Sequence, residues 1–135
     1  IDIEETQQMN TVAVIGLGYV GLPLVVEFGK HLRTIGFDIA KNKVLACQRG
    51  TDPSRELEDA QMAEAKHAIY TDDPALLGEA DVIITERALF RRYPEKGFVL
   101  EEVARGYTVD DIAACTDMDY VVSETVALNA FGPEV

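Results

Sequence analysis

The residues with the clearest chemical meaning are three glycines, Gly16, Gly18 and Gly21, spaced as G-x-G-x-x-G. They follow a short β-branched run and precede a helical pattern, which is typical of a loop that holds phosphate at a helix N-terminus. Gly16 is expected to make a tight turn, Gly18 to admit a pyrophosphate close to the backbone, and Gly21 to let helix and strand pack closely. The predicted site also includes Tyr19 and Val20, which lie within the motif.

A carboxylate follows at the position that this chemistry requires. Asp38 ends the next β-branched run, about 20 residues beyond the glycines, where a dinucleotide-binding fold carries an acid for the ribose. Its carboxylate can accept hydrogen bonds from both ribose hydroxyls of NAD and would repel the extra phosphate of NADP. The alternative is a glycine turn required only for packing. Because strand, helix and acid are in register, the pattern favours NAD as the cofactor.

The elements around this motif alternate between strand and helix patterns. Such alternation predicts βαβ units, right-handed crossovers and a parallel sheet, here with strand order 3-2-1-4. Predicted strands lie at residues 11–16, 34–39, 68–70 and 81–85, and predicted helices at 18–32, 41–49, 55–67 and 74–79.

The pattern changes after Thr85. Two extended runs at residues 88–93 and 98–103 flank the turn residues 94–97 and predict a β-hairpin. Thr108 is a good N-cap for a helix through residue 115, and residues 119–123 form a last strand candidate.

The predicted fold is a single α/β domain, a three-layer Rossmann-like sandwich whose mainly parallel sheet ends in a C-terminal β-hairpin extension. A leader is expected at residues 1–10 and a dinucleotide-binding half at 11–85. A hairpin-helix-strand extension follows at 86–128, and a tail at 129–135.

Composition excludes several classes of partner. The 135 residues contain 12 Lys+Arg and 24 Asp+Glu, a net charge of −12, which disfavours nucleic acid and anionic membranes. The longest apolar stretch, residues 12–26, is interrupted by glycines and Pro23 and is shorter than the roughly 18 residues of a membrane span. Cys47 and Cys115 have no paired spacing, which favours reduced thiols and a cytoplasmic location.

Other reactive side chains are expected to have structural roles. Cys47 and Cys115 are interpreted as small buried apolar residues. His31 and His67 each lie near a predicted helix end and are interpreted as either dipole contacts or solvent-exposed side chains. No spacing of cysteine, histidine or carboxylates converges on a metal ion. The sequence therefore predicts no catalytic residue and no metal site.

Three stretches resemble the N-terminus of the nucleotide-sugar dehydrogenases: VAVIGLGYVGLPL at residues 12–24, EFGK at 27–30 and TIGFDI at 34–39. The likeness runs over about residues 9–84 and is closest to the branch that oxidises UDP-N-acetylhexosamines for surface polysaccharides. It implies that NAD is the cofactor, that the glycines hold its pyrophosphate, that Asp38 holds the adenosine ribose, and that Lys43 lies close by.

The resemblance stops after Thr85. The family continues with Val-Pro-Thr-Pro beside the nicotinamide, whereas this chain has Thr-Glu-Arg-Ala at residues 85–88. The family's catalytic cysteine, its lysine and asparagine helpers, and its sugar-nucleotide domain lie farther downstream and have no counterpart here.

Residues 83–90, 97–104 and 107–112 instead resemble the C-terminal end of the β subunit of the 3-oxoacid CoA-transferases, a likeness that covers about residues 83–128. That family's glutamate nucleophile lies upstream of this segment, so Glu86, Glu101 and Glu102 do not inherit its role. The two likenesses meet in residues 81–85 and predict a chimera.

Three functional hypotheses follow. The first is an NAD(H)-binding module, derived from a nucleotide-sugar dehydrogenase, without turnover of its own. The second is a truncated or partner-dependent UDP-sugar dehydrogenase, and the third a structural chimera with no ligand.

A homodimer is also expected. Phe90 and Tyr93, like Phe98 and Val99, should lie on opposite faces of the hairpin and leave an apolar patch. On that basis Phe90→Glu should separate the dimer without unfolding the loop.

Overall fold

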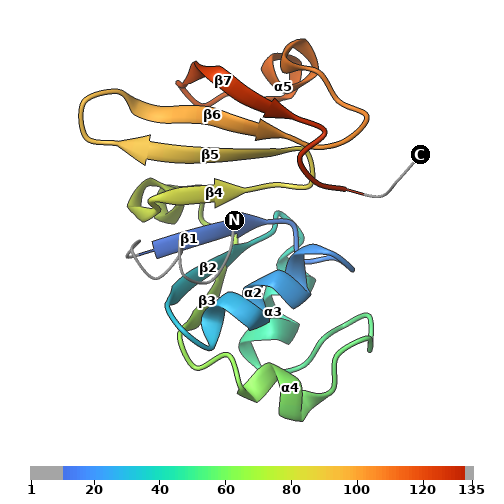
Figure 1. Ribbon diagram of the computed structural model, residues 1–135. Helices are drawn as coiled ribbons and strands as arrows, with labels where there is room; N and C mark the ends of the chain where they lie inside the picture. Colours follow the sequence, from blue (N-terminus) through green and yellow to red (C-terminus); the bar gives the residue numbers. More distant parts are fainter. Residues whose placement is uncertain (1–10, 133–135) are drawn as a thin grey trace. The chain divides into compact units, whose positions relative to one another are not determined.

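The computed structural model describes residues 11–132 (Figure 1). The predicted leader at residues 1–10 and the end of the predicted tail, 133–135, lie outside the described residues. The chain forms two compact units, Ile1–Ile83 and Ile84–Val135. Their boundary falls beside the change of pattern after Thr85, and the grouping of both into one domain stays a prediction.

The first unit is built from βαβ crossovers. Its elements in chain order are β1 (Thr11–Ile15), α2 (Gly21–Gly29), β2 (Arg33–Phe37), α3 (Lys41–Gln48), α4 (Asp59–Ala63), β3 (Ala68–Thr71), the 3-10 helix η1 (Pro74–Glu79) and β4 (Val82–Ile84), which spans the boundary. The strand order is β3-β2-β1-β4, and β1 and β3 both pair parallel to β2. The backbone N–H of Asp81 donates to the carbonyl of Thr11 at 2.8 Å beside β4.

The core of this unit lies between the strands and α2. Val12 and Val14 of β1 and Ile35 of β2 are at most 2% exposed, as are Leu22 and Val25 of α2. Such continuous apolar burial is expected of parallel strands covered by helices. Because both right-handed crossovers from β1 to β3 run in the same direction, α2 and α3 cover the same face of the sheet (Figure 1).

Two helices are shorter in the structure than the sequence predicts. The helix predicted at residues 18–32 is confined to α2, Gly21–Gly29, because residues 16–20 form the loop. The helix predicted at residues 55–67 is reduced to α4, Asp59–Ala63.

The buried carboxylate of Asp52 explains the second difference. It accepts hydrogen bonds from the backbone N–H groups of Ser54 and Leu57, both at 2.9 Å, and from the Ser54 hydroxyl. Burial alone would raise the pKa of Asp52, but these hydrogen bonds outweigh it and lower the pKa below its usual value. Arg55 within this turn has φ +63°, which no helix accepts.

The second unit contains the predicted hairpin. β5 (Ala88–Tyr93) and β6 (Gly97–Val103) pair antiparallel, and Gly97 takes φ +72° at the turn. α5 (Val109–Cys115) begins with the predicted cap: the hydroxyl of Thr108 accepts the N–H of Asp111, and the Asp111 carboxylate accepts that of Thr108. β7 (Val121–Leu128) pairs parallel to β6 and is longer than the strand predicted at residues 119–123. With its mostly parallel strands, the chain is an α/β protein, as predicted.

The hairpin's apolar residues are not arranged as expected. Phe90 is only 2% exposed, and its ring packs edge-on against Tyr120 with centroids 5.1 Å apart. Val99 is also buried, whereas Tyr93 is exposed. Phe90 therefore belongs to the core of the second unit, and Phe90→Glu would unfold that unit rather than separate a dimer. The expected exposure of Phe90 was wrong because the ring of Tyr120, which lies just before β7, packs against it.

Within residues 11–132, no helix is both long and apolar enough to cross a membrane.

Candidate functional site

The candidate site is the loop of residues 16–20, which joins β1 to α2. Gly16 takes φ +102°, a conformation that favours glycine. Its N–H donates to the carbonyl of Phe37 at 2.8 Å, so the end of β2 holds the start of the loop. The loop ends where the carbonyl of Gly18 accepts the N–H of Leu22 at 3.1 Å.

Gly18 and Gly21 differ in what surrounds them. A Cβ on Gly21 would lie 1.7 Å from the carbonyl oxygen of Gly16, so no side chain fits between α2 and the end of β1. A Cβ on Gly18 would meet nothing within 4 Å. Gly21 is therefore required for packing, whereas Gly18 leaves one side of the loop open to an approaching molecule.

The N-terminus of α2 is suited to an anion. No side chain caps the helix at Val20, and its first turn contains no acidic residue. The backbone N–H groups of a helix start and the positive end of its dipole attract negative charge. An anion placed over Gly18 would meet both.

Asp38 lies one residue beyond β2 and contacts this loop directly. Its Oδ2 accepts the N–H of Leu17 at 2.9 Å, and its Oδ1 accepts the N–H of Ala40 at 2.9 Å. Each carboxylate oxygen can accept a second hydrogen bond. The structure thus brings Asp38 and the glycine loop together and leaves both oxygens able to accept hydroxyl donors.

The remaining predicted site residues differ in exposure. The side chains of Tyr19 and Val20 are 71% and 68% exposed, and Lys43 is half-buried in the first turn of α3. Sequence reasoning missed Ile39, which is 87% exposed directly after Asp38. An apolar residue following the acid was the available signal. It also missed Leu17, whose backbone binds Asp38.

The two cysteines differ. Cys47 is buried as predicted, and burial, together with the negative charges of Asp52 and Asp38, raises the pKa of its thiol to about 11. Such a thiol stays protonated near neutral pH and is a poor nucleophile. Cys115 is exposed, which corrects the prediction that it is buried, because the last turn of α5 leaves it at the surface.

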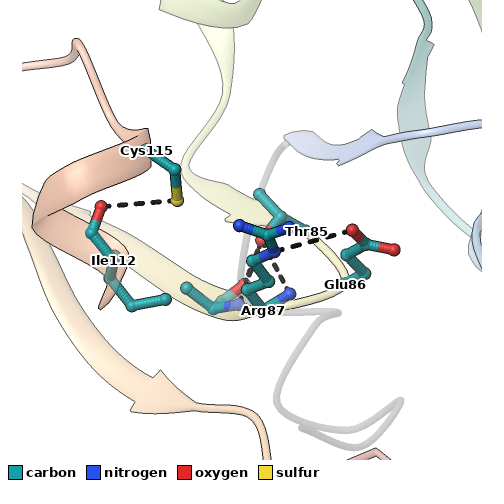
Figure 2. A network of polar contacts seen from close by, with 6 residues as sticks. Thr85, Glu86, Arg87, Ile112 and Cys115 are labelled. Atoms are coloured by element: carbon teal, nitrogen blue, oxygen red, sulfur yellow. Dashed lines mark hydrogen bonds and ion pairs between the residues drawn. The ribbon is translucent and has the colours of Figure 1, made fainter. Parts of the chain in front are cut away.

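Cys115 belongs to a small polar network in the second unit. Figure 2 shows the side chain of Arg87 between those of Cys115 and Glu86, with 3.6 Å between Arg87 Nε and Glu86 Oε1. The hydroxyl of Thr85 accepts the N–H of Arg87 at 3.0 Å and closes the turn before β5. Among the described residues, no group of three His, Cys, Asp or Glu side chains could hold a metal ion.

Parallel strands joined by a glycine loop and a helix, with an acid after the second strand, define a Rossmann-like α/β fold. The curated proteins that are similar to this chain include two UDP-N-acetyl-D-glucosamine 6-dehydrogenases. The one from Salmonella typhi is 40% identical over 73 residues, covering 54% of this chain and 17% of the relative. The one from Pseudomonas aeruginosa is 42% identical over 73 residues, with the same coverage.

A solved structure agrees. The UDP-D-ManNAc dehydrogenase from Pyrococcus horikoshii matches with a TM-score of 0.50 and 27% identity, covering 56% of this chain and 19% of that chain. No protein-family model matches the chain. The chain spans less than a fifth of these relatives' length, and the similarity to UDP-sugar dehydrogenases covers about half of the chain. The likeness of residues 83–128 to CoA-transferases stays a prediction.

Proposed function

We propose that the chain binds NAD(H) through the loop of residues 16–21 and Asp38. The observation that carries this proposal is the pair of hydrogen bonds from Leu17 and Ala40 to Asp38, which fix its carboxylate beside the loop. The open side of Gly18 and the uncapped start of α2 fit a pyrophosphate. The dehydrogenases that are similar to this chain support the same cofactor.

Each part of the dinucleotide has a matching group. The pyrophosphate would lie over Gly18 at the start of α2, and the ribose hydroxyls would donate to the remaining lone pairs of Asp38. Ile39 offers an exposed apolar surface to the adenine, and Lys43 would lie close to the adenosine ribose held by Asp38. NAD, when bound, supplies a hydride acceptor.

We further propose that the chain has no UDP-sugar dehydrogenase turnover of its own. Hydride transfer requires a substrate held against the nicotinamide by properly placed groups. Cys47, the cysteine of the first unit, is buried with a raised pKa and is unsuited to attack. If the chain is instead a partner-dependent dehydrogenase, a stable complex with its partner should restore NADH formation from a UDP-hexose. If it is a structural chimera without ligand, it should bind neither NAD nor NADP.

Isothermal titration calorimetry tests the binding proposal. We expect saturable heat with NAD, weaker binding of ADP because it lacks the nicotinamide half, and weakest binding of NADP because its 2′-phosphate would face Asp38. Absence of heat with NAD and ADP would favour the chimera without ligand. Tighter binding of NADP than of NAD would contradict the role of Asp38.

The expected homodimer stays a proposal, now with a different surface. β7 is the last strand of the second unit, and Val121, Val122 and Leu128 along it are 45–57% exposed. Exposed apolar residues on an edge strand favour association with a second copy. Sedimentation equilibrium at tens of micromolar should then show a dimer, and Val122→Glu should shift it to monomer. A monomer in the unaltered chain would contradict self-association.

A further inference from the structure

The glycine loop is attached to β2 through Leu17, the residue between its first two glycines. Leu17 is only 2% exposed, although its neighbours Tyr19 and Val20 are largely in solvent. Its N–H donates to Asp38 Oδ2 at 2.9 Å. Both its backbone and its side chain are therefore held, and the side chain turns inward toward the sheet.

The side chain of Leu17 occupies the space above Gly36 in β2. A Cβ on Gly36 would lie 3.0 Å from Leu17 Cδ2, 3.0 Å from Tyr70 Cδ1 of β3 and 3.3 Å from Val25 Cγ1 of α2. Gly36 pairs regularly with Val14 and Tyr70 within the sheet and has no left-handed φ. Its backbone therefore does not require glycine. A Cβ at Gly36 would instead crowd the three side chains that meet above it, which would have to move by a few tenths of an ångström to admit it.

We infer that Gly36 is a positioning residue for the phosphate loop. The absence of a side chain at Gly36 leaves space for the side chain of Leu17, and Asp38, two residues farther along the chain, accepts a hydrogen bond from the Leu17 backbone N–H. β2 and the residue that follows its end thus hold both the side chain and the backbone of Leu17 before any ligand binds. This inference rests on the proposed function, because it explains how the loop that we assign to NAD keeps its shape.

Two matched glycine substitutions test the inference. In Gly36→Ala the new methyl group displaces Leu17, and we expect NAD affinity to fall about tenfold because the loop is no longer preorganised. In Gly29→Ala the new Cβ would lie 3.0 Å from the Cβ of Ala68, an equally tight contact at the far end of α2. It should lower stability but leave the affinity for NAD within about twofold of the original.

A second measurement does not depend on NAD. Amide hydrogen exchange of Leu17 in the ligand-free chain should accelerate in Gly36→Ala, because the hydrogen bond to Asp38 loosens, but not in Gly29→Ala. If wild type does not bind NAD and Leu17 still exchanges faster only in Gly36→Ala, the proposed function fails while the positioning role stands. Equal effects of both substitutions on affinity and on Leu17 exchange would overturn the positioning role.

A third variant keeps the test decisive if Gly36→Ala does not fold. Leu17→Ala retains the backbone N–H but leaves the space above Gly36 unfilled. We expect it to fold, to exchange its residue-17 amide faster and to bind NAD about tenfold more weakly. An unchanged affinity and an unchanged exchange rate in this variant would show that the packing of Leu17 over Gly36 does not position the loop.

Discussion

Gly21→Ala is expected to destabilise the first unit by at least about 2 kcal/mol and to remove measurable NAD binding. The new Cβ would stand 1.7 Å from the carbonyl oxygen of Gly16 and 2.9 Å from its carbonyl carbon. These are backbone atoms at the end of β1, so relief requires α2 to move away from the strand. That movement displaces the helix N-terminus from the position where the pyrophosphate would bind. Urea unfolding and calorimetry with NAD measure the two effects.

Two other glycines provide the controls. A Cβ on Gly18 meets nothing within 4 Å, so Gly18→Ala should keep its stability but lose affinity, because the methyl group occupies the pyrophosphate's place. Gly78 in η1 has the same open surroundings away from the loop, and Gly78→Ala should leave NAD affinity unchanged. Wild-type stability and affinity in Gly21→Ala would show that the loop is not built as described.

Asp38→Ala should lower NAD affinity about tenfold to a hundredfold and narrow the preference for NAD over NADP. The substitution removes the charged acceptor of the ribose hydroxyls and, at the same time, the partner of the Leu17 and Ala40 N–H groups. The affinity for NADP should fall less than the affinity for NAD, because the substitution also removes the repulsion between Asp38 and the 2′-phosphate of NADP. Parallel titrations of both cofactors give the affinity ratio.

The matched control removes the same charge elsewhere. Asp72 is exposed, and its Oδ2 lies 4.0 Å from Nζ of Lys41, the first residue of α3. Asp72→Ala should leave the ratio of NAD to NADP affinity unchanged. An equal change of that ratio in both variants would attribute the preference to net charge rather than to a contact with Asp38.

The glycine loop could be predicted because its requirements are local. Gly16 needs a positive φ and Gly21 a close approach, and both leave a signature in residue type. Asp38 could be predicted from its spacing along the sequence from the glycines, and in the structure its carboxylate contacts the loop. The parallel strands were found because continuous β-branched runs predict burial on both faces.

The remaining features depend on contacts that no local pattern contains. The predicted helix at residues 55–67 was shortened by the hydrogen bonds of Asp52, and the burial of Phe90 follows from Tyr120, 30 residues away in the chain. In the sequence Gly36 is one glycine within a strand, and nothing local indicates that the side chain of Leu17 packs above it. Side-chain exposure and positioning roles of this kind are set by tertiary packing.

Titration of the isotope-labelled chain with NAD, followed by backbone amide NMR, tests the central claim most directly. NAD should shift the amide resonances of residues 16–22 and 38–40 in a saturable way, and those of β5 and β6 should not move. Saturable shifts confined to residues 88–128, or no shifts at millimolar NAD, would contradict the assignment of this loop as the cofactor site.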